Sequence, residues 1–264
     1  MSGAHLLRLA ALLFGFGFLY GPIVILATMS FNASRLVTVW GGFSTKWYAA
    51  LLHDEQMLRA AEISLAAAAL SALIATINGL LAALALARFG GFRSRTLFAG
   101  SIYAPLVMPE VVLGLGLLLV FVAFGVERAF LTLVLAHASF TMCFATVMIH
   151  AALKSCDRTL EEAAMDLGAT PVRAFALVTL PLIAPSVVSA YLLAFIISLD
   201  DLVIASFTTG PGATTLPMRI YSQVRLGVSP EVNAISTLLL GFVAVALGLS
   251  ALLTRGRAKG GGAG

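Results

Sequence analysis

The chain has 264 residues, of which 60% are hydrophobic and only 11% are charged, and its formal net charge is +4. Soluble domains carry roughly 25% charged residues and just under half apolar ones, so this composition excludes an ordinary soluble domain and indicates a membrane protein. The basic residues are scattered between apolar runs without forming a basic face, which argues against nucleic acid as a partner. Cys143 and Cys156 lack the spacing of a zinc or redox site.

Six apolar segments are long enough to cross a bilayer as helices. A helical span needs about 20 mainly apolar residues, and the segments of this kind are 6–30, 58–87, 97–124, 130–151, 182–206 and 234–254. The polar stretches between them are too short to build a separate aqueous core, so we expect residues 1–264 to form a single all-α transmembrane domain. The first segment is longer than the apolar region of a signal peptide, and we expect it to remain as a helix.

The distribution of basic residues predicts the orientation of these spans. Six spans place both termini on one side of the membrane, together with ten of the 16 lysines and arginines. Because cytoplasmic loops are enriched in lysine and arginine, we expect both termini in the cytoplasm. Segments 31–57 and 207–233 then lie outside, and segment 152–181 forms a cytoplasmic loop between the fourth and fifth spans.

Glu110 stands within the third apolar segment, directly after Pro109. A carboxylate at the centre of a membrane helix costs roughly 2.5 to 3.5 kcal/mol on insertion scales, so it normally faces a bundle interior or a watery cavity. Two interpretations follow. Glu110 lines a solute pathway, or it accepts hydrogen bonds from backbone amides that are freed at a helix break beside the proline.

The loop between the fourth and fifth spans has the pattern of two short helices. The spacing of Thr159 and Glu162 is that of a capping box, which predicts a helix start. Gly168 is suited to a left-handed C-cap, and Thr170-Pro171 predicts the N-cap and first residue of a second helix. We expect this second helix to end before Leu180-Pro181 introduces the fifth span.

The first helix of this loop carries an apolar stripe where no bilayer is available. Four apolar residues recur at helical spacing, and three acidic residues occupy the other positions. The apolar residues are Leu160, Ala163, Ala164 and Leu167, and the acidic ones are Glu161, Glu162 and Asp166. A charged run is ordinarily a solvated connector, but the capping signals and the stripe favour a docking surface for another protein.

Two adjacent carboxylates, Asp200 and Asp201, lie near the outer end of the fifth apolar segment. Neighbouring helix positions are about 100° apart, so the two side chains cannot point the same way. One interpretation places both in the outer interface. The other, which we favour, has one carboxylate lining a solute path and the other bonded to neighbouring residues, and the pattern does not distinguish the two.

The loop resembles a known family. The stretch "EAAMDLGATPVRAFALVTLP" is similar to the E-A-A, three residues, G, nine residues, I-x-L-P pattern of permease subunits in bacterial ABC importers, with valine where isoleucine is usual. The residues that match by position are Glu162, Ala163, Ala164, Gly168, Leu180 and Pro181. Two further stretches resemble the permeases of polyamine importers, "APLVMPEVVLGLGLLLVF" and "SLDDLVIASFTTGPGATTLPM". Two short segments are closer to the putrescine permease than to the spermidine one, namely "LVTVW" and "GPGATTLP".

This resemblance implies a type I importer fold in the bacterial inner membrane, a second homologous permease, two ATPase subunits and a periplasmic polyamine-binding protein. It also implies that an ATPase-coupling helix is formed by seven residues of the loop. These are Glu161, Glu162, Ala163, Ala164, Asp166, Leu167 and Gly168.

The sequence lacks a phosphate-binding G-x-x-x-x-G-K-[ST] loop, so we expect no ATPase site in this chain. It also lacks the HExxH and G-x-S-x-G motifs, and we expect no covalent chemistry and no cofactor or metal. ATP and Mg²⁺ would then be bound by the partner ATPase. Three alternatives remain: an ABC permease for another solute, a proton-coupled secondary carrier that uses its membrane carboxylates, and a passive membrane scaffold.

Overall fold

The computed structural model describes residues 3–36, 39–227 and 229–260, and their regular structure is helical apart from one isolated bridge between Asn32 and Phe43. The expectation of an all-α protein is therefore confirmed. Contacts divide the chain into two compact units. Unit 1 comprises Met1–Arg59 and Arg219–Gly248, and unit 2 comprises Ala60–Met218 and Leu249–Gly264.

Unit 1 contains α1 (Gly3–Met29), α2 (Lys46–Leu51) and most of α11 (Leu216–Leu226) and of α12 (Pro230–Gly260). The loop between α1 and α2 is organised around Asn32. Its side-chain oxygen accepts hydrogen bonds from the backbone N–H groups of Ser34 and Gly41, at 3.0 and 2.7 Å. The indole of Trp47 donates to the backbone oxygen of Asn32 at 2.7 Å, so α2 is fixed to the same loop.

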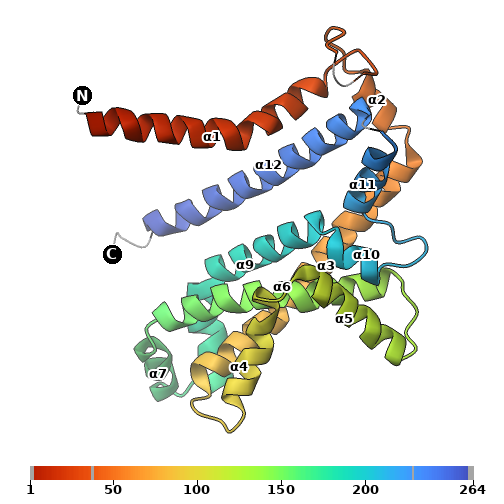
Figure 1. Cartoon of the computed structure of the whole chain (residues 1–264). Coiled ribbons are helices and arrows are strands. Elements are labelled where there is room, and N and C mark those ends of the chain that lie inside the picture. Colours follow the sequence, from red (N-terminus) through yellow and green to blue (C-terminus); the bar gives the residue numbers. More distant parts are fainter. Residues whose placement is uncertain (1–2, 37–38, 228, 261–264) are drawn as a thin grey trace. The chain divides into compact units, whose positions relative to one another are not determined.

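Unit 2 holds the remaining helices, in the arrangement of Figure 1. They are α3 (Glu55–Arg88), α4 (Arg95–Tyr103), the 3₁₀ turn η1 (Ala104–Leu106), α5 (Glu110–Ala123), α6 (Phe130–Ser155), α7 (Thr159–Asp166), α8 (Pro171–Ala174), the π-helical turn η2 (Phe175–Thr179), α9 (Leu180–Asp200) and α10 (Val203–Thr208). Helices α6 and α9 run side by side and contact each other over much of their length.

Small residues let the helices of unit 2 approach closely, as is usual in membranes. Ala83 of α3, Ala145 of α6 and Ala190 of α9 are fully buried in one apolar cluster. A Cβ added to Gly79 would lie 2.9 Å from the Cβ of Ala145, which is tighter than a real contact. The glycine is therefore needed for the contact between α3 and α6.

Four helices of the described part are long and apolar enough to cross a membrane. They are Leu7–Met29, Glu55–Arg88, Phe130–Ser155 and Pro171–Asp200. A fifth span results if the bent pair Arg95–Leu106 and Glu110–Ala123 counts as one. Five of the six predicted segments thus have counterparts in these helices or in the bent pair, and the sixth lies within α12, whose apolar part in this search is Pro230–Val245.

The prediction of one continuous helix over the third segment, 97–124, is wrong. The chain bends by 116° between Arg95–Leu106 and Glu110–Ala123. Pro109 has no N–H to donate and restricts the preceding residue to extended conformations, so the first helix ends before it. Pro109 itself is the N-cap of α5, with φ −58° and ψ 134°, and Glu110 therefore lies in the first turn of a new helix.

The fifth predicted segment, 182–206, also differs at both ends. The helix runs without interruption from Pro171 through η2 to Asp200, so the expected break at Leu180-Pro181 is wrong. In an ordinary α-helix the ring of Pro181 would clash with the carbonyl one turn earlier. The π-helical turn η2 ends two residues before Pro181 and makes this turn wider, so the helix continues past the proline. At the other end, α9 stops at Asp200 because Asp201 is extended, with φ −65° and ψ 125°.

The start of α6 packs closely against the segment after α10, and this contact gives a test of the fold. A Cβ added to Gly210 would overlap the backbone carbonyl oxygen of Arg128. We therefore expect Gly210→Ala to lower the free energy of unfolding by about 1 to 3 kcal/mol, because backbone atoms must move. Thermal unfolding in detergent measures the effect. Gly116→Ala is the matched control, since nothing lies within 4 Å of its added Cβ, and equal melting temperatures would contradict this packing.

Candidate functional site

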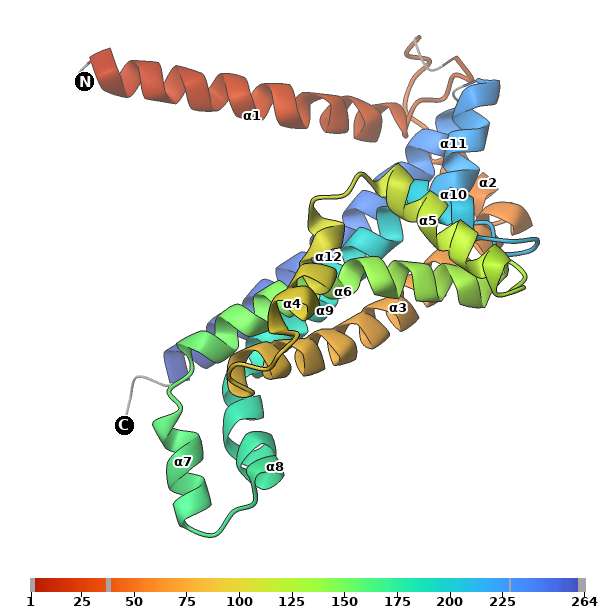
Figure 2. The ribbon, with the colours of Figure 1, turned by 60° about the horizontal axis from the view of Figure 1, so that its bottom comes forward.

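The α7–α8 hairpin projects from one end of unit 2, beyond the ends of α3 and α6 (Figure 2). Helix α7 ends in a Schellman motif, in which the Gly168 N–H donates to the Met165 carbonyl at 2.9 Å and the Ala169 N–H donates to the Ala164 carbonyl at 3.1 Å. Gly168 has φ +93°, in the left-handed region. The predicted glycine C-cap is confirmed.

Helix α8 begins as predicted, because the Thr170 side chain accepts a hydrogen bond from the Arg173 N–H and Pro171 is the first helical residue. The predicted capping box at Thr159 is wrong. Thr159 is already inside α7, and its N–H donates to the carboxylate of Asp157 at 3.0 Å. This hydrogen bond lowers the pKa of Asp157, a residue that lies outside the spanning helices.

The apolar stripe of the hairpin is solvent-exposed in the described chain. Leu160 is 49% exposed and Leu167 is 90% exposed, and Val172 of α8 adds a third apolar side chain at 78%. Ala163 is exposed and Ala164 is half-buried. Large apolar side chains this exposed on one hairpin are typical of a surface that binds another protein.

The two adjacent glutamates of α7 have different surroundings. Glu162 faces solvent and pairs with Arg158, one turn earlier, at 3.0 Å, and the two side chains are 53% and 58% exposed. Glu161 faces the membrane helices, where its Oε2 lies 3.0 Å from Nη2 of Arg88 and accepts a hydrogen bond from the Thr179 hydroxyl at 2.9 Å. Glu162 and the exposed Asp166 are thus available to a partner, whereas Glu161 is held within the chain.

At the opposite end of α9, Asp200 and Asp201 also differ. Asp200 is exposed. The side chain of Asp201 is only 5% exposed; its Oδ1 lies 3.2 Å from Nε2 of His137 and accepts a hydrogen bond from the Ala205 N–H at 2.8 Å. The Ala205 contact ties Asp201 to the first turn of α10, which explains why the helix breaks between α9 and α10.

His137 extends this polar contact into the core of unit 2. Its Nδ1 lies 2.7 Å from the Ser198 hydroxyl, which is 3.0 Å from the hydroxyl of Ser71. Helices α3, α6 and α9 are joined in this way through buried polar groups. The sequence signal for this role was weak, because His137 is isolated in an apolar run and its partners are far away along the chain.

Glu110 is exposed in the first turn of α5. The charge that acts most on the Asp200 carboxylate is that of the adjacent Asp201, and the charge of Glu110 acts on it more weakly. Helix α5 packs on α10. A Cβ added to Gly114, one turn after Glu110, would meet the ring of Phe207 at 2.7 Å and the Cα of Ile204 at 3.3 Å. The two helix breaks, before α5 and after α9, therefore allow α5, which begins at Glu110, to pack on α10, which follows Asp200.

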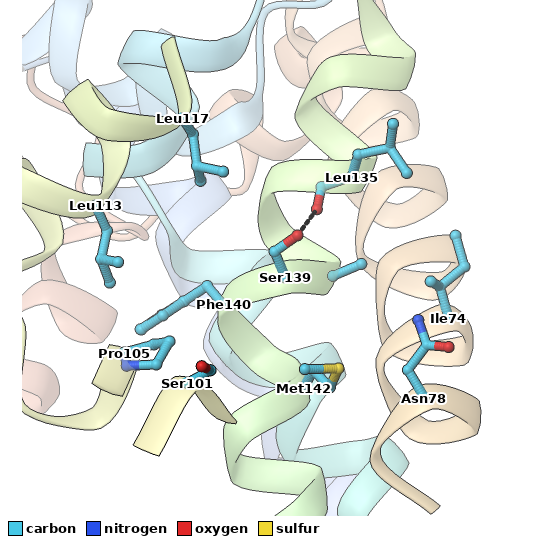
Figure 3. Close-up of a pocket in the computed structure, with 11 residues that line it drawn as sticks. Ile74, Asn78, Ser101, Pro105, Leu113, Leu117, Leu135, Ser139, Phe140 and Met142 are labelled. Carbon is cyan, nitrogen blue, oxygen red and sulfur yellow. Dashed lines mark hydrogen bonds between the residues drawn. The ribbon is translucent and has the colours of Figure 1, made fainter. Parts of the chain in front are cut away.

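A cavity of about 390 Å³ lies between α3, α4, α5 and α6 (Figure 3). Its lining is mostly apolar and includes Leu113 and Leu117 of α5, on the helix face that continues from Glu110. Three polar side chains, those of Asn78, Ser101 and Ser139, also line it. The Ser139 hydroxyl donates to the Leu135 carbonyl at 2.8 Å, so it is already satisfied.

Unit 2 is a bundle of broken and continuous apolar helices with an exposed helical hairpin at one end (Figure 2). One chain of a bacterial ABC transporter involved in the import of the acidic polysaccharide alginate has the same fold. The match has a TM-score of 0.70 and 19% identity, and it covers 95% of this chain and 96% of the other. The expected all-α fold of an ABC importer chain is therefore confirmed, and the number of spans and the side of the termini stay predictions.

Residues 75–256 match the family described as the inner membrane component of binding-protein-dependent transport systems, and the chain belongs to this family. The putrescine transport system permease PotI of Escherichia coli K12 is 53% identical over 244 residues, covering 90% of this chain and 87% of the relative. The spermidine/putrescine permease PotC of the same strain is 40% identical over 245 residues, covering 93% and 92%. The resemblance to polyamine permeases is therefore confirmed.

Family membership establishes the general role of the chain. It is a membrane subunit of a transport system in the inner membrane, and it is a permease component and not the ATPase. Within the described residues, no three His, Cys, Asp or Glu side chains are grouped so as to hold a metal ion.

Proposed function

We propose that this chain translocates polyamines, with putrescine as the favoured substrate, within an ATP-driven importer. The observation that carries the proposal is the 53% identity to a putrescine permease over nine-tenths of the chain. The importer would contain a second homologous permease, two ATPase subunits that bind ATP and Mg²⁺, and a periplasmic polyamine-binding protein. Residues 1–264 would form one permease domain with six spans, α12 being the sixth, and both termini in the cytoplasm.

The α7–α8 hairpin is the proposed docking element for the ATPase. Its exposed apolar side chains, Leu160 and Leu167, would enter a cleft of that subunit, and the exposed carboxylates of Glu162 and Asp166 would meet basic groups at its rim. Ala163, Ala164 and Gly168 keep the hairpin slim enough for such a cleft. Closure of the ATPase dimer would move the hairpin and switch the paired permeases between outward and inward access.

Asp200 and Glu110 are the proposed pathway carboxylates. Both are exposed and their charges interact, so a cation that approaches them replaces mutual repulsion with attraction. A diamine with an ammonium group at each end suits two neighbouring carboxylates, and an anion would be repelled. Asp201, which lies against His137 and accepts a hydrogen bond from the Ala205 N–H, would position the helix break instead of contacting the solute.

Reconstitution tests the proposed function. The complex of this chain with its ATPase, second permease and binding protein, in proteoliposomes containing ATP, is expected to accumulate labelled putrescine only when the binding protein is present. Uptake of another solute alone would identify a different ABC permease. Uptake driven by a proton gradient in vesicles that hold this chain without the ATPase would identify a secondary carrier, and no uptake of any solute would favour a scaffold.

A further inference from the structure

Three elements of unit 2 meet at the carboxylate of Glu161. Arg88 is the last residue of α3, Thr179 is the last residue of η2, and Glu161 is in the first turn of α7. The Glu161 Oε2 lies 3.0 Å from the Arg88 guanidinium and 2.9 Å from the Thr179 hydroxyl. One oxygen atom of the hairpin is therefore linked to two membrane helices.

The burial of these side chains distinguishes the contact from an ordinary surface pair. The Arg88 and Glu161 side chains are only 16% and 15% exposed, and Thr179 is 1% exposed. By contrast, the neighbouring pair of Arg158 and Glu162 is more than half exposed, and exposed pairs hold their partners weakly. Within the described residues, Nε and Nη2 of Arg88 are buried without a hydrogen-bond partner, so the guanidinium depends on the negative charge of Glu161 for compensation.

The position of each partner suits a mechanical link. Arg88 stands at the C-terminus of α3, where the helix dipole favours a cation. Thr179 ends the π-helical turn at the base of α9, and such turns are irregularities that occur frequently at functional sites. The two ends of the hairpin segment also pack on unit 2, since Cys156 and Phe175 lie against the apolar cluster of α3, α6 and α9.

We propose that Glu161, Arg88 and Thr179 form a strut that transmits the displacement of the hairpin to α3 and α9. Glu161 is then a positioning residue directed inward, and it is not part of the surface that binds the ATPase. The proposal rests on the proposed function for the docking of an ATPase on the hairpin. When a side-chain contact of the strut is removed, the ATPase still docks and hydrolyses ATP, but the movement of the hairpin is not passed on to α3.

The test compares Arg88→Gln, Glu161→Gln and the double variant in the reconstituted complex. Arg93→Gln is the matched control, since Arg93 is an exposed arginine near the same end of α3 and has no ion pair in the described chain. Each single variant is expected to retain the ATPase and its hydrolysis but to lower solute uptake per ATP by roughly 10-fold. The double variant is expected to be no worse than Arg88→Gln, because both changes remove the same link.

A merely structural role predicts a different result, in which uptake and ATP hydrolysis fall together with the amount of assembled complex. That result, or additive losses in the double variant, would overturn the strut, as would uptake per ATP equal to that of Arg93→Gln.

A distance measurement tests the strut without reference to the solute. Spin labels replace Thr159 on α7 and Leu81 on α3, both exposed, in a background with Cys143→Ala and Cys156→Ser. In the assembled complex, the distance between labels is expected to stay constant on nucleotide binding in the otherwise native chain and to change with Arg88→Gln. A distance that behaves identically in both overturns the strut. Absence of putrescine uptake by the native complex would instead contradict the proposed function.

Discussion

Replacing Asp200 by asparagine and Glu110 by glutamine together is expected to reduce the apparent kcat/KM for putrescine uptake at least about 100-fold. One ammonium–carboxylate contact at 4 Å is worth about 4 kcal/mol at an effective dielectric constant of 20, and every 1.4 kcal/mol is tenfold. Because both carboxylates are exposed and their charges interact, neutralising them removes the attraction for a dication without leaving a buried partner unpaired.

The matched control for this experiment is Glu127→Gln, an exposed carboxylate in the loop between α5 and α6. Uptake is measured in proteoliposomes with saturating binding protein, so that the initial selection of the solute is the same for all variants. The ATPase activity of each complex shows whether assembly is intact. Unchanged uptake kinetics in the double variant, with Glu127→Gln also unchanged, would remove both carboxylates from the pathway.

Features that depend on a few neighbouring residues were predictable from the sequence. The C-cap at Gly168 and the N-cap at Thr170 are local, and both have the expected hydrogen bonds. The capping box failed for an equally local reason. Asp157, two residues before Thr159, is itself a good cap acceptor and binds the N–H that ends the loop, so the helix starts one residue earlier than the box requires.

Helix breaks and long-range partners were not predictable in this way. Apolar periodicity continues through Val107–Pro109 and through Asp201, so hydropathy alone joins helices that the structure separates. The different surroundings of Glu161 and Glu162 follow from Arg88 and Thr179, which are remote in sequence and reach α7 only after the membrane helices pack. Nothing local distinguishes the two glutamates.

Replacing Gly168 by valine, or Glu162 by lysine, is expected to abolish transport by separating the chain from its ATPase. Gly168 has φ +93°, and nothing lies within 4 Å of an added Cβ, so the obstacle to a side chain is backbone conformation and not space. A β-branched residue there costs on the order of 1 to 3 kcal/mol and opens the turn that sets α7 against α8. Glu162→Lys reverses the charge of an exposed side chain on the proposed docking face.

Two substitutions separate backbone conformation from side-chain volume at this turn. Gly168→Asn is expected to retain most uptake, because asparagine tolerates the left-handed region far better than valine. Gly91→Ala is the control, since Gly91 lies in the loop between α3 and α4, has no positive φ and has no atom within 4 Å of an added Cβ. Membrane insertion should be normal in every variant, since none changes a spanning helix. Full ATPase co-purification and full uptake with both Gly168→Val and Glu162→Lys would show that the hairpin is not the docking element, and valine and asparagine behaving alike would show that its left-handed turn is not what the partner requires.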